Sequence, residues 1–287
     1  MKHLHLALAS AFVAFAPIAQ AFEFWAVNTS NALVRYNSAA PGTALFSASI
    51  TGLVGIDGVT ADAFGQISDI SYVGSTLYGI DGNANLYTLN TATGSATLVS
   101  STFSPAGFDL GLASDPFIPG GGLRVVSSTA ENFTAALGGV FTAGTSVFVG
   151  AGLGDVNEGA SLSFSGLAID PDFGTGFAFD ANLDTLFITN DANFAEFFTV
   201  GLLGFDFTAM ASIDFLSESM LIAAFSTDSS TSEFYTINAL TGAATQVGSF
   251  GTGITSIAIP EPSTYAALVG LAGLALAATS RRRRVTA

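Results

Sequence analysis

The chain has 287 residues, no cysteine and a formal net charge of −15. Between residues 22 and 259 it contains two arginines and 21 acidic residues, and neither lysine nor histidine. This composition excludes a disulfide framework, nucleic acid as a partner, and any site built on a Ser-His-Asp triad, a Cys-His pair, a lysine Schiff base or a histidine-bound zinc. Carboxylate chemistry is the one enzyme mechanism that these residue types leave open.

The first 21 residues have the features of a secretory signal peptide. Lys2 provides the positive charge, residues 4–16 are mostly apolar, and Ala19 and Ala21 occupy the small-residue positions of a cleavage site. We expect signal peptidase to cut after Ala21, so that the exported chain begins at Phe22. A buried N-terminal helix is the alternative, but the segment lacks the amphipathic spacing that such a helix needs.

A hairpin unit occurs twice in the chain with the same spacing. Residues 86–101 (LYTLNTATGSATLVSS) align without a gap with residues 234–249 (FYTINALTGAATQVGS), and a weaker copy begins at residue 33. Asn90 and Gly94 are placed to form a tight turn, because asparagine bonds nearby backbone and glycine adopts positive φ. The alternation before the turn predicts a strand, and residues 96–99 are expected to form the return strand.

Further strand sequence precedes each hairpin, at residues 70–81 with a turn at Gly74, and at residues 219–226. Similar apolar strands are expected at residues 123–127 and 183–189. The units recur about every 45 to 50 residues, a period typical of propeller blades. We therefore predict an all-β fold, a β-propeller-like repeat domain of about five or six blades over residues 22–259. A β-sandwich and an open repeat array are the alternatives.

The repeat domain resembles the DUF4394 family, a domain of unknown function found in exported bacterial proteins. The resemblance rests on Phe108-Asp109, on residues 123–127 (LRVVS), on residues 201–208 (GLLGFDFT) with Ile213-Asp214, and on the final hairpin. It covers most of residues 24–259 and implies no established activity. Residues 128–158 depart from the pattern because they lack a clear Asn-x-x-Thr-Gly turn.

Oxygen-bearing side chains are concentrated between residues 170 and 193. Calcium takes about six to eight oxygen ligands, and the segment starting at Asp180 opens like an EF-hand loop. It departs from that pattern at Thr185, where glycine is expected, and at Asp191, where glutamate is expected. We expect no cofactor, with calcium as the candidate ion and ordinary turn formation as the alternative. The candidate calcium ligands are Asp170, Asp172, Asp180, Asn182 and Asp184.

Arg124 lies in an expected strand and is one of the two cations of the domain. We expect it to pair with a neighbouring acid such as Asp109, with recognition of a sugar acid or a peptide carboxylate as the alternative. Several aromatic residues could stack on sugar rings, although the repeat favours the core or the rim of a blade for the tyrosines. These aromatic residues are Trp25, Tyr72, Tyr78 and Tyr87.

The last 28 residues, 260–287, combine three features in a fixed order. A Pro-Glu-Pro element ends the domain, an apolar helix is expected over residues 263–280, and four arginines occupy residues 281–284. The 19 residues between Glu261 and Arg281 carry no charge. As a helix they would span about 28 Å, close to the roughly 30 Å hydrocarbon core of a bilayer, and the arginines would stay in the cytoplasm. An ordinary C-terminal membrane anchor is one interpretation of this segment.

The tail also resembles the PEP-CTERM sorting signal of Gram-negative bacteria, with Ile259 in place of the usual valine. The resemblance implies a transient membrane anchor that an exosortase cuts near the Pro-Glu-Pro element. It also implies delivery to the cell surface or the extracellular polymer matrix. The sorting and processing residues are then Ala19, Ala21, Pro260, Glu261, Pro262, Arg281, Arg282, Arg283 and Arg284.

From these features we expect a non-catalytic structural or binding component of the envelope or the matrix, with exopolysaccharide as a candidate partner. No catalytic residue is assigned. A carboxylate-based enzyme acting on polysaccharide is the first alternative, which a pocket pairing a carboxylate of raised pKa with an ionised one would favour. A calcium-dependent adhesin is the second, which oxygen coordination near residues 170–191 would favour.

Overall fold

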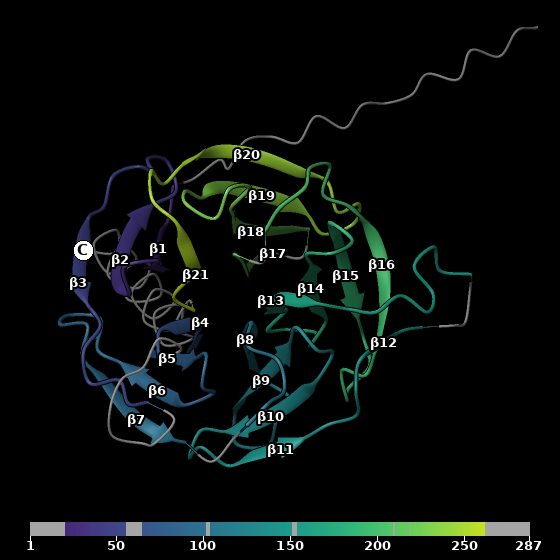
Figure 1. Ribbon diagram of the computed structural model, residues 1–287, viewed down its shortest axis with the longest axis horizontal. Helices are drawn as coiled ribbons and strands as arrows, with labels where there is room; N and C mark the ends of the chain where they lie inside the picture. Colours follow the sequence, from purple (N-terminus) through teal and green to yellow (C-terminus); the bar gives the residue numbers. More distant parts are fainter. Residues whose placement is uncertain are drawn as a thin grey trace, which may run out of the picture.

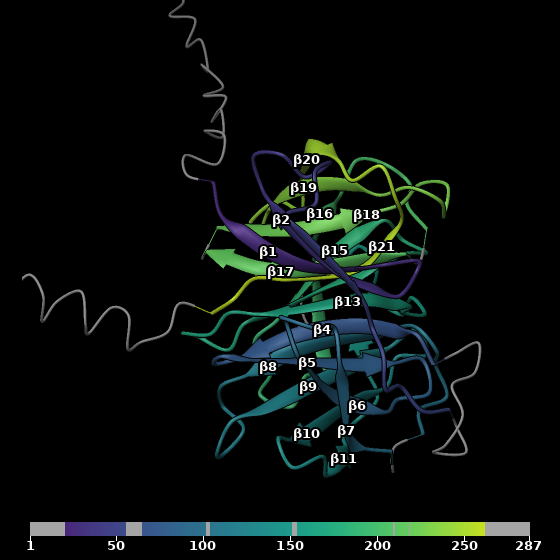
Figure 2. The same cartoon turned by 90° about the vertical axis from the view of Figure 1, so that its left-hand side faces the viewer.

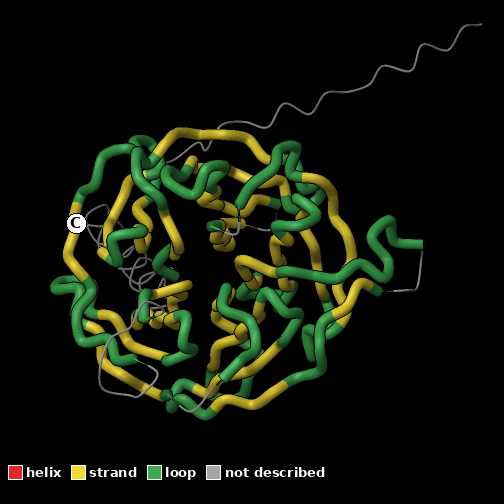
Figure 3. Tube along the Cα trace, viewed as in Figure 1, coloured by secondary structure: helices red, strands yellow, loops and turns green. Residues whose placement is uncertain are grey.

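The computed structural model describes residues 21–55, 65–101, 104–150, 154–208, 210–217 and 219–261. Within these ranges the chain forms 21 strands and no helix, arranged as five sheets around one axis (Figures 1 and 3). The fold is a five-bladed β-propeller, which confirms the all-β prediction and selects five of the predicted five or six blades. In these described residues no helix has the length and hydrophobicity of a membrane span. The apolar segment 263–280 and residues 1–20 of the predicted signal peptide lie outside them.

Each blade is a sheet whose strands follow one another from the axis outward, and the first blade takes its innermost strand from the end of the chain. The first blade contains β21 (Ile254–Ala258), β1 (Glu23–Asn28), β2 (Ala32–Asn37) and β3 (Phe46–Ser49). The second contains β4 (Ile67–Val73), β5 (Thr76–Asp81), β6 (Leu86–Leu89) and β7 (Ala96–Ser100). The third contains β8 (Leu110–Asp115), β9 (Gly122–Ser127), β10 (Asn132–Ala136) and β11 (Phe141–Ala143).

The fourth blade has five strands, and the fifth returns to four. The fourth contains β13 (Phe164–Ile169), β14 (Gly176–Asp180), β15 (Thr185–Thr189), β16 (Glu196–Leu202) and β12 (Phe148–Val149). The fifth contains β17 (Ala211–Ser217), β18 (Met220–Phe225), β19 (Glu233–Asn238) and β20 (Ala244–Ser249). The extra strand, β12, pairs in parallel with the outer edge of β16. It lies in the region, residues 128–158, where the repeat pattern fails, because there the chain leaves a short β11 and joins the neighbouring blade.

The repeated hairpins form as the sequence predicts. Asn90 Oδ1 accepts hydrogen bonds from the backbone N–H of Ala92 (2.9 Å) and Thr93 (3.2 Å), and Gly94 has a φ of +76°. In the second copy, Asn238 Oδ1 accepts from the N–H of Leu240 at 2.8 Å. The asparagine therefore organises the turn and the glycine supplies the left-handed backbone that closes it.

Apolar side chains fill the space between neighbouring blades. Phe179 of the fourth blade and Phe225 of the fifth have ring centroids 4.6 Å apart, and Phe24 of the first blade stacks on Phe234 of the fifth at 5.0 Å. Trp25, Tyr72, Tyr78 and Tyr87 are also buried. The four aromatic residues therefore lie in the core and not at a sugar-binding surface. The core or the rim of a blade was the position expected for the three tyrosines.

The ring is closed by the pairing of the last strand with the first. β21 and β1 are antiparallel, with Trp25 opposite Ala258 and Ala26 opposite Ile257. Figure 2 shows the blades from the side, with the strands of the two chain ends in one blade. Closure leaves β21, β4, β8, β13 and β17 around the axis (Figure 1).

Candidate functional site

Polar side chains of the inner strands meet at the axis of the propeller. Asp69 Oδ1 of β4 accepts hydrogen bonds from the hydroxyls of Ser256 on β21 (2.6 Å) and Ser212 on β17 (3.2 Å). Asp69 Oδ2 accepts from the backbone N–H of Leu112 on β8 at 2.7 Å. One carboxylate thus connects four of the five blades, and we call Asp69, Ser212 and Ser256 the axial cluster.

The axial cluster replaces the strand partners that the inner strands lack on their axial side. Each inner strand is an edge, and its axial N–H groups need acceptors. Ser256 Oγ accepts from the N–H of Ile70 at 2.7 Å, and Ser212 Oγ accepts from the N–H of Ile257 at 3.0 Å. Towards the ends of the strands, Ser71 Oγ plays the same role for the N–H of Ser114 on the neighbouring strand β8 at 2.9 Å.

Asp69 is sealed inside the protein. Its exposed fraction is 2%, and burial raises its pKa to about 8 although hydrogen bonds to the ionised form oppose the shift. Ser212 in β17 and Ser256 in β21 occupy the position that Asp69 has in β4. An alignment of the inner strands is therefore the sequence signal that could have identified the cluster. Its burial gives it a structural role, since no substrate reaches the carboxylate.

The axial cluster separates two pockets on opposite faces. The inner strands begin on one face, which we call the N-face, and end on the other, the C-face. The N-face pocket has a volume of about 400 Å³. Its polar lining consists of Gln66, Ser68, Asp109, Ser165, Thr208, Ser229 and Thr255.

Two groups of the N-face pocket lack hydrogen-bond partners in the described part of the chain. The Asp109 side chain is exposed to solvent and makes no hydrogen bond or ion pair there, although the groups around it desolvate the carboxylate enough to raise its pKa. Ser165 is 7% exposed, and its hydroxyl has no partner either. Ser68, Ser165 and Thr255 are the unpaired residues at bulges of β4, β13 and β21, and a bulge redirects a side chain out of the regular sheet pattern.

The C-face pocket, of about 650 Å³, contains the start of the sorting element. Its lining includes Tyr72, Asp172, Asp214 and Glu261. Asp214 Oδ2 accepts from the N–H of Ile259 at 2.5 Å, and Glu261 Oε2 accepts from the N–H of Gly74 at 2.9 Å. Desolvation, with a smaller contribution from the negative charge of Glu261, raises the pKa of Asp214 to about 7.

The predicted sorting residues are only partly within the described residues. Pro260 and Ala21 are exposed, and Glu261 is half-buried in the C-face pocket. The remaining predicted residues, Ala19, Pro262, Arg281, Arg282, Arg283 and Arg284, lie outside the described residues. The part of the sorting element that is described therefore lies against the propeller.

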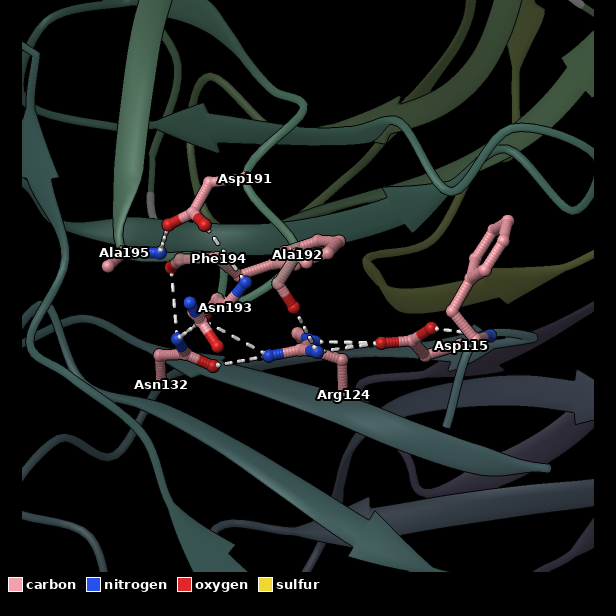
Figure 4. A network of polar contacts seen from close by, with 9 residues as sticks. Asp115, Arg124, Asn132, Asp191, Ala192, Asn193, Phe194 and Ala195 are labelled. Carbon is pink, nitrogen blue, oxygen red and sulfur yellow. Dashed lines mark hydrogen bonds and ion pairs between the residues drawn. The ribbon is translucent and has the colours of Figure 1, made fainter. Parts of the chain in front are cut away.

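Arg124 pairs with an acid, but the acid is Asp115 and not Asp109 (Figure 4). Its Nε and Nη2 donate to Asp115 Oδ2 at 3.0 and 2.8 Å. Nη2 also donates to the carbonyl of Ala192, and Nη1 donates to the carbonyl of Asn193, both at 3.2 Å. The expectation of Asp109 was wrong because Asp115 lies on β8 two residues beyond Ala113, the register partner of Arg124, and so reaches the guanidinium diagonally across the β8–β9 pair.

The remaining donor of Arg124 is also occupied. Nη1 donates to Asn132 Oδ1 at 3.2 Å, and the guanidinium carbon lies 4.2 Å from the centre of the Phe194 ring. A guanidinium has five N–H donors, and these contacts use all five. Arg124 therefore joins the third blade to the β15–β16 loop of the fourth, with no donor left to recognise a sugar acid.

The structure does not bring the five candidate calcium ligands together. Asp170 and Asp172 lie in the turn before β14. Asp180 ends β14, and Asn182 and Asp184 follow in the next turn, at the opposite end of the strand. Asp170 Oδ1 accepts from the N–H of Asp172 at 2.8 Å, and Asp180 Oδ1 accepts from that of Asn182 at 2.9 Å. No group of three acidic side chains suited to a metal occurs among the described residues. These carboxylates serve as turn acceptors.

We expect calcium to leave the thermal unfolding midpoint of the exported chain unchanged. Binding to the native state alone would raise the midpoint, and separated turn carboxylates offer no site for such binding. The measurement compares unfolding in millimolar calcium with unfolding in chelator. A rise of several degrees that Asp180→Ala with Asp184→Ala removes would restore the calcium hypothesis.

Solved structures that resemble the chain include two with low sequence identity. A chain of the nidogen/laminin complex matches with a TM-score of 0.48 and 11% identity, covering 83% of this chain and 98% of that one. A structural genomics protein of unknown function from Bacteroides thetaiotaomicron VPI-5482 matches with a TM-score of 0.43 and 16% identity, covering 79% of this chain and 69% of that one. Likenesses of this level add nothing on function. No curated protein matches the sequence.

Family models match both parts of the chain that the sequence had distinguished. The model described as "Domain of unknown function (DUF4394)" matches residues 32–259. This range contains every strand of the five blades except β1. The model described as "PEP-CTERM protein-sorting motif" matches residues 258–284. The chain therefore belongs to the DUF4394 family and carries a PEP-CTERM sorting motif directly after its closing strand.

Proposed function

We propose that this protein is a non-catalytic binding module that exosortase sorts to the cell surface or the extracellular polymer matrix. The ligand of the N-face pocket would be rich in hydroxyl groups, such as a sugar unit of exopolysaccharide. The sorting motif supports the destination. The observation that carries the binding role is the Asp109 carboxylate, which lines the pocket and meets no donor among the described residues.

The N-face pocket offers acceptors more than donors. Thr208 Oγ1 donates to the carbonyl of Ser226 at 3.0 Å, and Thr255 Oγ1 donates to that of Val27 at 3.2 Å. The hydroxyl hydrogens of Thr208 and Thr255 are thus used within the protein, whereas the Ser165 hydroxyl and the Asp109 carboxylate remain free to bind a ligand. A ligand with several neighbouring O–H donors complements this arrangement, because one carboxylate accepts from two adjacent hydroxyls.

Binding of exopolysaccharide purified from the producing bacterium should depend on Asp109. A hydrogen bond to a charged group contributes about 1.5–3 kcal/mol, so Asp109→Asn should weaken binding roughly 10- to 100-fold. The matched control is Asp172→Asn, which removes a charge at the C-face pocket and should leave the affinity unchanged. Calorimetry of both variants makes the comparison.

The opposite pattern, in which Asp172→Asn alone weakens binding, would move the site to the C-face. Binding that weakens steeply as salt is added would point to a cationic ligand instead of a sugar, because salt screens charge attraction. Absence of any binding by the wild-type chain would overturn the proposed role of the pocket.

A carboxylate-based enzyme acting on polysaccharide is the second candidate. The observation in its favour is the C-face pocket, where Asp214, with its pKa raised to about 7, lies near Asp172 and Glu261. Against it, both oxygens of Asp214 already accept backbone N–H groups, those of Phe215 and Ile259. Release of reducing sugar ends by the wild-type chain, abolished in Asp214→Asn, would establish this candidate over the first.

A further inference from the structure

The two ends of the folded chain leave the propeller from the same face. β21 runs towards the C-face, and the antiparallel β1 begins there, with Trp25 opposite Ala258. Phe22 and Ile259 pack against one hydrophobic cluster, between the first and fifth blades. The segments that precede residue 22 and follow residue 261 are therefore attached to the C-face, close to each other.

Both ends are held by hydrogen bonds up to the first and last residues of the fold. The N–H of Phe22 donates to Ser38 Oγ at 3.0 Å, and the N–H of Ser38 donates back to the carbonyl of Phe22 at 2.9 Å. At the other end, Asp214 holds Ile259, and Gly74 holds the Glu261 carboxylate. The residues between the closing strand and the Pro-Glu-Pro element are therefore held against the propeller and do not form a flexible linker.

We propose that the anchored protein has its C-face towards the membrane and its N-face pocket directed away from it. This inference rests on the proposed function, because it takes the apolar segment after Pro262 as the anchor. Only Pro262 lies between Glu261 and the apolar segment 263–280, and even three extended residues would reach at most about 11 Å. A strand of six residues is about 20 Å long, so the domain cannot turn over to bring its N-face to the bilayer.

The orientation also defines an interaction surface. The element that exosortase recognises is held at the C-face pocket, so a membrane-embedded peptidase meets this face while it acts on the tail. The surface that it meets carries Asp172 and Glu261. The N-face pocket stays accessible to a ligand from the matrix throughout sorting.

Single cysteines can test the orientation, because the chain has none of its own. Ser219→Cys is exposed at the C-face pocket, and Gln66→Cys is exposed at the N-face pocket. Each variant of the exported chain, residues 22–287, is labelled with a fluorophore and reconstituted into vesicles with a headgroup energy acceptor. With the faces about 20 Å apart, energy transfer should be roughly two-fold or more stronger from Ser219→Cys than from Gln66→Cys.

Equal transfer from the two positions in protein that floats with the vesicles would overturn the proposed orientation. Protein that does not float with vesicles would instead overturn the anchoring step of the proposed function. A positive control inserts about 20 Gly/Ser residues after Glu261, a linker with a mean reach of about 25 Å. This insertion should abolish the difference between the two positions while the protein still floats.

Discussion

Replacing Asp69 by alanine should lower the free energy of unfolding by about 3–5 kcal/mol, a loss typical of breaking a buried polar network. The side chain accepts hydrogen bonds from Ser212, Ser256 and the N–H of Leu112, each on a different blade. Alanine would leave these donors buried without an acceptor and would open a cavity at the axis. Urea unfolding followed by tryptophan fluorescence measures the change. A loss below about 1 kcal/mol would show that the axial cluster does not hold the ring together.

Asp69→Asn is the control, and it also tests the effect of pH. The pKa of Asp69 is about 8 in the folded protein and near the ordinary aspartate value of 3.8 when unfolded. Stability from this raised pKa is fully present below about pH 4, where both states are protonated. As pH rises towards 8, the unfolded state ionises first and stability falls by up to about 1.4 kcal/mol per pH unit.

Asp214 has a pKa of about 7 in the folded protein. It therefore adds a similar fall in stability between about pH 4 and pH 7. Wild-type stability should therefore decrease from pH 4 to pH 8, and Asp69→Asn should reduce the slope without removing it, because Asp214 remains. A wild-type profile that rises across this range would contradict the shifts of both carboxylates.

Replacing Arg124 by alanine should cost about 3–5 kcal/mol, because it leaves the buried Asp115 carboxylate without its partner. The side chains of the pair are 6% and 3% exposed. The matched control is the other arginine of the domain, Arg35, which pairs with Glu23 at 3.4 Å with both side chains about half exposed. Arg35→Ala should change stability by less than about 1 kcal/mol, as exposed ion pairs do.

A double variant separates the value of the pair from the cost of an unpaired charge. Arg124→Met with Asp115→Leu removes both charges and keeps apolar volume, so it should be more stable than Arg124→Met alone. Thermal unfolding of the three proteins makes the comparison. If the double variant is the least stable, the hydrogen bond that Asp115 Oδ1 accepts from the N–H of Phe117 contributes more than the unpaired carboxylate costs.

Much of the fold could be predicted from the chain because its units are local. Asn90 and Gly94 close a turn between adjacent strands, so the information for each hairpin lies within about 16 consecutive residues. Repetition then implied blades, and the Pro-Glu-Pro element with its arginines identified the sorting motif. Blade number was predicted only approximately, because β11 is short and β12 joins the next blade.

The partners of the buried polar groups were decided by the tertiary structure. Asp69 meets Ser256 across 187 residues and Ser212 across 143, and no local pattern specifies such contacts. Asp170 and Asp180 are near in sequence, yet a strand of five residues holds their turns apart. The chain by itself determined the hairpins, the blade type and the sorting motif, because each depends on neighbouring residues. Ring closure alone decided the axial cluster and the two pockets, because each forms only when separate blades meet.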